Sequence, residues 1–231
     1  MTQILRFHWR LYAVTLAGLA GVALFGSRAP ILALAAMPAA FWLAASLAVS
    51  WYVYDRSPLG RYEWLAGVLA RRPARWINLH AGVDNAGAIL PRLFPGDGRT
   101  FDIFDPAEMT EPSIREARRA LHATPPEAPV DWDALPPQDA AFLIFTAHEL
   151  RRPEARMRLF GALARSLAPG GEIALVEHLR DWRNFLAFGP GAFHFLSART
   201  WRDAARAAGL RIRTEFSITP FVRVFLLERP Q

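Results

Sequence analysis

Side chains that can accept or donate protons follow two apolar segments in the second half of the chain. His148 comes directly after one apolar segment, and Glu177 and His178 end the next. His194 lies in the aromatic-rich stretch that follows. Imidazole titrates near neutral pH and a carboxylate can orient it, so these types are typical of general acid-base chemistry. We expect His148 to be the leading candidate base and His178 the second, while a structural role satisfied by backbone or arginine stays open for each.

A second group of residues, in the stretch WINLHAGVDNAG at positions 76–87, suits a nucleotide-type ligand. Gly82 permits a close approach of the backbone, and Asp84 can cap the helix expected after it. Asp105 follows the next predicted strand, where a carboxylate can accept hydrogen bonds from two ribose hydroxyls, and Asp102 competes for that role. A loop glycine and one acid also occur in ordinary turns, so this signal is weak by itself.

The elements that must position these groups alternate between short apolar runs and helical patterns from residue 76 onward, which predicts an α/β sheet. In such a sheet, ligands bind beyond the carboxyl ends of the parallel strands. The predicted strands cover residues 76–79, 100–104, 141–145, 172–176, 211–216 and 222–227, and the predicted helices cover residues 86–93, 111–121, 153–167 and 198–208. The Pro-rich residues between 121 and 139 are expected to form a loop with at most one short edge strand.

The first 54 residues are of a different kind. Two uncharged runs, at residues 11–25 and 31–54, are separated by a short polar turn that contains Arg28. Their lengths predict a transmembrane helical hairpin over residues 1–54, with Pro38 tolerated inside the second helix. Because a second apolar run follows the first so soon, we expect no signal-peptide cleavage. The alternative is a hydrophobic hairpin that packs on the soluble domain or lies in one leaflet.

Residues 55–75 have apolar positions at helical spacing, with arginine and glutamate between them. This pattern predicts an amphipathic linker helix with Ser57 as its N-cap and Pro58 in its first turn. We expect it to lie at the membrane interface, and packing on the following domain, over residues 76–231, is the alternative.

The composition narrows the classes of partner. All 27 basic residues are arginine, and the net charge is +6. Arginines flank the predicted hairpin on both outer sides, whereas Arg28 stands alone in its turn, so both ends are expected on the cytoplasmic side of the inner membrane. We expect the lipid bilayer as a partner and no nucleic acid. The absence of cysteine excludes disulfides, thiolate metal sites and a cysteine nucleophile, and we assign no metal ligands from the sequence.

Three motifs carry a resemblance to a known family. They are Thr146-Ala147-His148-Glu149-Leu150, Leu167-Ala168-Pro169-Gly170-Gly171, and Glu177-His178, followed by a helix from Trp201 and a final hairpin. In this order and spacing the segment from about residue 75 to 229 resembles the class I S-adenosylmethionine-dependent methyltransferases. The resemblance implies a doubly wound Rossmann-like sheet with a C-terminal antiparallel hairpin, and S-adenosyl-L-methionine as cofactor.

Carried over residue by residue, the resemblance assigns the loop from Asn78 to Gly82 to the methionine part of the cofactor and Asp105 to its ribose. The adenine is then expected near Trp132 and the loop that begins at Thr146. The full set of expected cofactor-binding residues is Asn78, His80, Gly82, Asp84, Asp105, Trp132 and Thr146. This loop departs from the family pattern, because Asn78 stands where an acid is usual and His80 and Asp84 replace glycines.

The resulting hypothesis is a membrane-anchored methyltransferase that acts on a hydrophobic small molecule or lipid. Residues 180–197, rich in phenylalanine, are expected to cover the acceptor or to dip into the membrane interface. The altered glycine loop keeps an alternative open: a catalytically inactive, methyltransferase-like membrane scaffold or interaction protein. The acceptor atom, whether oxygen, nitrogen, carbon or sulfur, has no local signature on such a fold.

Overall fold

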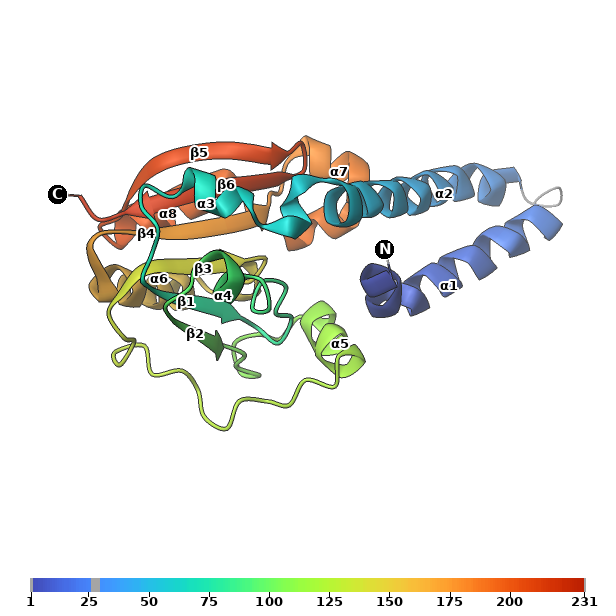
Figure 1. The fold of residues 1–231 in the computed structure, drawn as a ribbon. Helices are drawn as coiled ribbons and strands as arrows, with labels where there is room; N and C mark the ends of the chain where they lie inside the picture. The colour runs from blue at the N-terminus through green and yellow to red at the C-terminus, as the bar shows by residue number, and fades with distance from the viewer. Residues whose placement is uncertain (1, 26–29, 231) are drawn as a thin grey trace.

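The computed structural model describes residues 2–25 and 30–230 and contains one sheet with helices on both faces (Figure 1). Six strands lie in the order β2-β1-β3-β4-β6-β5. The first four along the chain are parallel, and β6 pairs antiparallel with both β4 and β5. This is the predicted doubly wound sheet with its C-terminal hairpin. The strands are β1 (Arg75–His80), β2 (Asp97–Asp102), β3 (Gln138–Ile144), β4 (Leu167–His178), β5 (Arg211–Thr219) and β6 (Val222–Glu228).

Two strands differ from the prediction in a way that matters for the site. β2 begins and ends earlier than residues 100–104, so its last residue is Asp102 rather than Phe104. β4 begins at Leu167 and runs through the Pro-Gly-Gly segment, where Gly170 has φ +70° and the pairing with β3 shifts register. The glycine therefore permits a bulge inside a strand rather than a turn before one.

Most of the helices that cover the sheet match the prediction. They are α5 (Pro112–Ala120), α6 (Pro153–Ser166) and α8 (Ala198–Ala207). The predicted helix over residues 86–93 is reduced to α4 (Leu90–Leu93), and the residues before it form turns in which the Asp84 carboxylate accepts hydrogen bonds from the backbone amides of Ala86 and Gly87. Residues 121–137 contain no strand.

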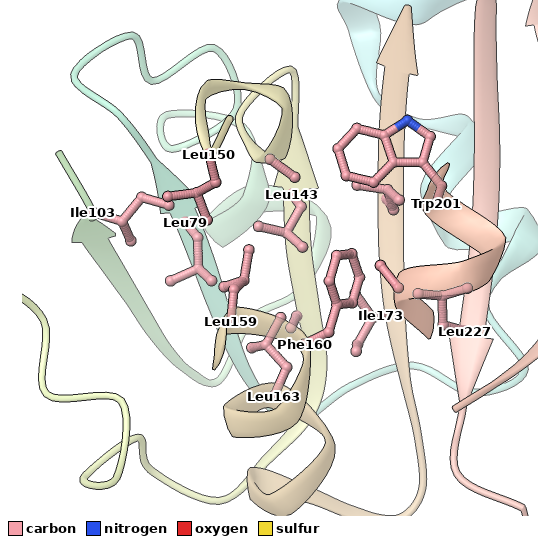
Figure 2. Packing of buried hydrophobic residues seen from close by; sticks show 14 of the residues in the cluster. Leu79, Ile103, Leu143, Leu150, Leu159, Phe160, Leu163, Ile173, Trp201 and Leu227 are labelled. Atoms are coloured by element: carbon pink, nitrogen blue, oxygen red, sulfur yellow. The ribbon is translucent and has the colours of Figure 1, made fainter. Parts of the chain in front are cut away.

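Each face of the sheet has its own buried cluster. Figure 2 shows one face, where Leu143 and Ile173 of the central strands meet Phe160 of α6 and Trp201 of α8. The opposite face packs against the chain that precedes β1, which includes the short helices η3 (Pro58–Arg61) and α3 (Trp64–Val68). Since both faces are covered, the inner strands β1, β3 and β4 are mostly apolar and buried, as is typical of parallel sheets, whereas the edge strand β2 is polar and largely exposed.

The linker before β1 differs from the expected interfacial helix. Ser57 does cap it, since its hydroxyl accepts a hydrogen bond from the Leu59 amide, and Pro58 follows in the first turn. However, Tyr62 adopts a left-handed conformation and breaks the helix, and the apolar side chains Leu59, Tyr62 and Leu65 are buried against the sheet. These side chains therefore pack on the domain, because the sheet face needs this cover, and a position of the linker at the membrane interface stays a prediction.

The two N-terminal helices are α1 (Thr2–Phe25) and α2 (Pro30–Trp51), and both extend away from the sheet (Figure 1). Of the described residues, one helical segment, Ala36–Arg56, has the length and the mean hydropathy, 1.4, to cross a membrane, and 11% of it is buried. The apolar part of α1, Tyr12–Leu24, is shorter. The polar turn with Arg28 lies outside the described residues. Insertion as a hairpin remains a prediction.

The α2 helix is fastened to the domain at its C-terminal end. Its last turn continues into a π-helical turn, η2 (Tyr52–Arg56), and α2 packs along α7 (Trp182–Phe188). Trp42 meets Phe185 of α7 edge-on, with 5.6 Å between the ring centroids. Gly189, with φ +57°, follows α7 directly, and a Cβ there would lie 2.7 Å from the Trp42 ring. The aromatic segment after β4 therefore touches the apolar helix.

Replacement of Phe160 by alanine tests the packing of the first cluster. Phe160 is fully buried, so Phe160→Ala should lower the free energy of unfolding by about 3–5 kcal/mol through lost transfer energy and a cavity. Met157, on the same helix, is 51% exposed, and Met157→Ala should change it by less than about 0.5 kcal/mol. Chemical unfolding in detergent measures both, and equal effects would show that α6 does not pack as described.

Candidate active site

The loop after β1 folds on itself through polar side chains. The Nδ2 group of Asn78 donates to the Asp84 carboxylate at 2.9 Å, and the Gly82 amide donates to Nδ1 of His80 at 2.9 Å. Gly82 has φ +101°, a conformation that residues with a Cβ rarely adopt. Asn78, His80 and Asp84, which differ from the family pattern, therefore support the loop around a glycine.

A buried arginine from α5 completes this loop. The Nη1 group of Arg118 donates to the Ala81 carbonyl at 2.9 Å and to the Asp102 carboxylate at 2.7 Å, and its Nη2 group donates to the Thr124 carbonyl at 2.7 Å. The guanidinium also lies over the Phe104 ring, 4.1 Å from its centroid. A Cβ on Gly82 would fall 2.1 Å from Nη1. Gly82 thus lets the loop backbone lie against the Arg118 guanidinium. The sequence alone does not reveal this contact.

The acid that ends β2 is Asp102. It pairs with His80 in the β1–β2 register, so its carboxylate lies beside the glycine loop. Asp105, the predicted ribose ligand, lies in the next turn, where its carboxylate accepts a hydrogen bond from the Ala107 amide at 2.8 Å. Asp102, the competing candidate for the ribose, is thus the acid at the end of the strand, because β2 ends earlier than its apolar pattern indicates.

The two residues expected near an adenine have local roles. Thr146 is buried and its hydroxyl donates to the Ile144 carbonyl at 3.1 Å. Trp132 is half-buried and packs against the first hydrophobic cluster. These contacts neither assign nor exclude a part in ligand binding.

At the ends of β3 and β4 the structure brings three of the predicted proton-transfer residues together. Nδ1 of His148 lies 2.7 Å from the Glu177 carboxylate, which is fully buried and also accepts the His148 backbone amide. The Nε2 atom of His148 lies 3.3 Å from a carboxylate oxygen of Glu149. Nε2 of His194 lies 3.8 Å from the same oxygen. Two imidazoles and two carboxylates therefore form one cluster.

This cluster perturbs the pKa values of its members. Burial disfavours the charged form of His148, but the charge of Glu177 and the hydrogen bonds to both glutamates prevail and raise its pKa to about 10. Burial likewise opposes the Glu149 carboxylate, and hydrogen bonds to the two histidines lower its pKa to about 2. In this state His148 is protonated at neutral pH, so it must lose that proton before it can act as a base.

His194 reaches the cluster from a distant part of the chain. It ends the 3-10 helix η5 (Gly189–His194), and Leu196 then pairs with Leu179 just beyond β4. Its carbonyl accepts a hydrogen bond from Arg151, and its Nδ1 lies 3.8 Å from the Glu111 carboxylate. Residues 180–197, the segment expected to cover the acceptor, therefore bring His194 next to the cluster.

His178 lies apart from this cluster, because consecutive residues of a strand point to opposite faces. Its Nδ1 lies 2.9 Å from the Phe221 carbonyl, which can only accept, so its Nε2, 2.8 Å from the Tyr54 hydroxyl, is the acceptor of that bond. The ring is stacked between Phe145 and Phe195, with both centroid distances 4.9 Å. Both nitrogens are used, so His178 ties the end of the apolar helix to the sheet.

Sequence reasoning missed Glu149, Arg118 and Tyr54. Glu149 had a signal, since it is adjacent to His148 and a second histidine follows the next strand. Arg118 had no such signal, because nothing in the sequence distinguishes a buried arginine from the others among the 27. Tyr54 lies in the apolar run at residues 31–54, which gives no sign that its hydroxyl is hydrogen-bonded to His178.

The sequence matches no protein-family model and no curated protein. Solved structures with a similar fold include human N-acetylserotonin methyltransferase in complex with SAM, at 18% identity over 99% of this chain and 70% of that one, with a TM-score of 0.56. A SAM-dependent methyltransferase from Clostridium acetobutylicum is 11% identical over 80% and 98%, with a TM-score of 0.54. PhzM, a pyocyanin biosynthetic protein, is 13% identical over 78% of this chain, which spans 61% of PhzM, with a TM-score of 0.53. The likeness shows that the fold is that of the S-adenosylmethionine-dependent methyltransferases.

The burial of His178 predicts a dependence of stability on pH. Burial is the largest cause that lowers its pKa, to about 4 from 6.5, and nearby His148 adds to it, while Phe221, Asn184 and Asp181 oppose the shift. The unfolded chain therefore takes up this proton first, and stability should fall by up to about 3 kcal/mol as the pH drops from 6.5 to 4. Above that range the contribution is constant.

The variant His178→Gln isolates this effect. It should be less stable than the wild type at neutral pH, because the Tyr54 and Phe221 partners are disturbed, but its stability should vary less with pH in the acid range. Urea unfolding in detergent at a series of pH values measures both slopes. Parallel curves for the two proteins would show that His178 is not held neutral in the fold.

Proposed function

We propose that this protein is an S-adenosylmethionine-dependent methyltransferase that acts on a hydrophobic small molecule or lipid at a membrane surface. The observation that carries the proposal is the glycine loop between β1 and α4, with Arg118 and Asp102 beside it, at the carboxyl edge of a methyltransferase-type sheet. Ligands of such sheets bind at this edge.

The residues present fit the cofactor. Its methionine end carries a carboxylate and an ammonium group, and the loop offers the Arg118 guanidinium and the Asp84 carboxylate as groups of opposite charge. Its ribose has two hydroxyl groups, and the Asp102 carboxylate at the end of β2 can accept hydrogen bonds from them. Gly82 has no side chain, and the space beside it is filled by the Arg118 guanidinium, so the glycine brings this cation to the loop.

The two halves of the edge would have separate tasks. When bound, the cofactor supplies an activated methyl group on a sulfonium, and transfer is an in-line displacement that depends on orientation and exclusion of water. The ends of β1 and β2 would hold the donor. The ends of β3 and β4, with His148, Glu149 and His194, would face the acceptor, and η5 closes over them.

The surface beside the apolar helix supports a hydrophobic acceptor. A shallow open groove lies between α2, α7 and the turn between β5 and β6, and its mostly apolar lining includes Val49, Leu186 and Phe221 together with Arg183. Trp182 and Leu186 of α7 are largely exposed, next to the segment that is long enough to cross a membrane. We place the catalytic domain on the cytoplasmic side of the inner membrane, in keeping with the arginines at both ends of the hairpin.

Titration calorimetry of the detergent-solubilised protein with S-adenosylhomocysteine tests the cofactor site. Asp102→Asn should weaken binding by about tenfold or more, because a charge-assisted hydrogen bond to the ribose is lost. Asp105→Asn should leave the affinity within about twofold, with thermal unfolding as a check that both variants fold. The reverse ranking would restore the ribose role to Asp105. No binding to the wild type at millimolar ligand would contradict the proposed function.

The lack of cysteine allows a direct test of the membrane-facing surface. Trp182→Cys and Met157→Cys each create a single labelling site, on α7 and on α6. With an environment-sensitive fluorophore and vesicles of phosphatidylcholine and phosphatidylglycerol, the label at position 182 should report an apolar surrounding and be quenched by spin-labelled lipid. The label at position 157 should report water. Identical spectra at both sites would exclude α7 from the interface.

A further inference from the structure

The cluster at the ends of β3 and β4 contains more negative charge than its permanent cations balance. Three carboxylates, Glu111, Glu149 and Glu177, contact its two histidines. Among the described side chains, the fixed positive charge in contact with this group is Arg151, which approaches Glu111 at 3.5 Å. Glu149 and Glu177 are buried, and buried carboxylates are costly unless a cation pairs with them.

Three potential ligand atoms converge at one point of this cluster. Nε2 of His148 and Nε2 of His194 lie 3.3 Å and 3.8 Å from the same oxygen of Glu149. Potential ligand atoms of these three residues all lie within 4.8 Å of one another. Nitrogen and oxygen ligands of one tetrahedral ion with bonds of about 2.1 Å are about 3.4 Å apart. The arrangement thus needs only small adjustments to hold an ion.

His148 also has the support that a metal-bound imidazole usually has, whereas His194 faces a carboxylate at more than hydrogen-bond distance. A ligating histidine donates its other ring N–H to a carboxylate or carbonyl, which fixes the ring and its tautomer. Nδ1 of His148 lies 2.7 Å from Glu177, and Nδ1 of His194 lies 3.8 Å from Glu111. The two Nε2 atoms point at Glu149.

The burial of the Glu149 carboxylate is an independent observation that supports a cation site. Glu149 is 5% exposed, and its second carboxylate oxygen, Oε2, is buried without a hydrogen-bond partner. Buried carboxylate oxygens in native structures are normally paired, and an unpaired one calls for a missing partner. A cation held between Glu149 and the two imidazoles would be that partner.

The geometry points to a divalent transition-metal site formed by His148, Glu149 and His194, with Glu177 orienting the His148 imidazole. Two imidazoles and one carboxylate are a ligand set for Zn²⁺, and also for Fe²⁺ when coordination positions stay open. His194 is the most exposed of the three, so the open position is expected on its side. Any part of the ion in methyl transfer rests on the proposed function, but its binding does not.

Zn²⁺ added to tag-free, chelator-treated full-length protein in detergent tests the site by titration calorimetry, with Co²⁺ absorption as the spectroscopic readout. We expect one ion per chain. Glu149→Gln and His194→Ala should weaken binding by more than about a hundredfold, and Glu177→Gln by about 10–100-fold. The control His122→Ala removes an exposed histidine outside the cluster and should bind as the wild type does.

Two results would overturn the site. The first is a wild type that binds no Zn²⁺ and shows no ligand-field absorption with Co²⁺. The second is a pair of folded variants, Glu149→Gln and His194→Ala, that bind Zn²⁺ as tightly as the wild type. Since S-adenosylhomocysteine binding is measured separately, failure of the metal site and failure of the proposed function are distinguishable.

Discussion

The arrangement of this protein depends on two polar side chains buried in consecutive positions at the end of β4. Glu177 is fully buried and His178 nearly so, on opposite faces of the sheet. Neither can stay there without partners, because an unpaired buried polar group costs about 1–3 kcal/mol and a charge costs more. The chain supplies them from distant segments: His148 pairs with Glu177, and Tyr54 pairs with His178. The strand end thereby connects the candidate active site to the N-terminal helices.

That connection explains how an apolar helix can be held in a fixed relation to the site. The π-helical turn after α2 carries Tyr54 onto His178, while α7 packs on α2 at Trp42 and leads through η5 to His194. The helix that we propose to lie in the membrane and the segment that closes over the acceptor side are therefore parts of one packed unit. Such an arrangement suits the proposed acceptor from the lipid phase, because the apolar helix and the candidate site are held in a fixed relation.

Much of the fold could be predicted from the sequence, because buried parallel strands are continuous apolar runs and the helices between them have regular polar faces. The candidate site was harder to predict from the sequence than the fold. The assignment of the strand-end acid to Asp105 instead of Asp102 arose because β2 contains polar residues and its end is set by pairing with β1. The role of Arg118 depends on a contact 37 residues away in the chain, and no local pattern encodes it. His148 and Glu177 were predicted because one follows β3 and the other lies at the end of β4, and the two strand ends meet at one edge.

The central claim is that this edge transfers a methyl group to a molecule in the lipid phase. Its most direct test is incubation of the protein, reconstituted in vesicles made from a total bacterial lipid extract, with S-adenosylmethionine that carries a tritiated methyl group. The account predicts tritium in the organic phase after solvent extraction with the wild type, and only background when Gly82 is replaced by valine, whose Cβ would collide with the Arg118 guanidinium and distort the loop. Background counts with the wild type, in a preparation that binds S-adenosylhomocysteine, would contradict a lipid-phase acceptor.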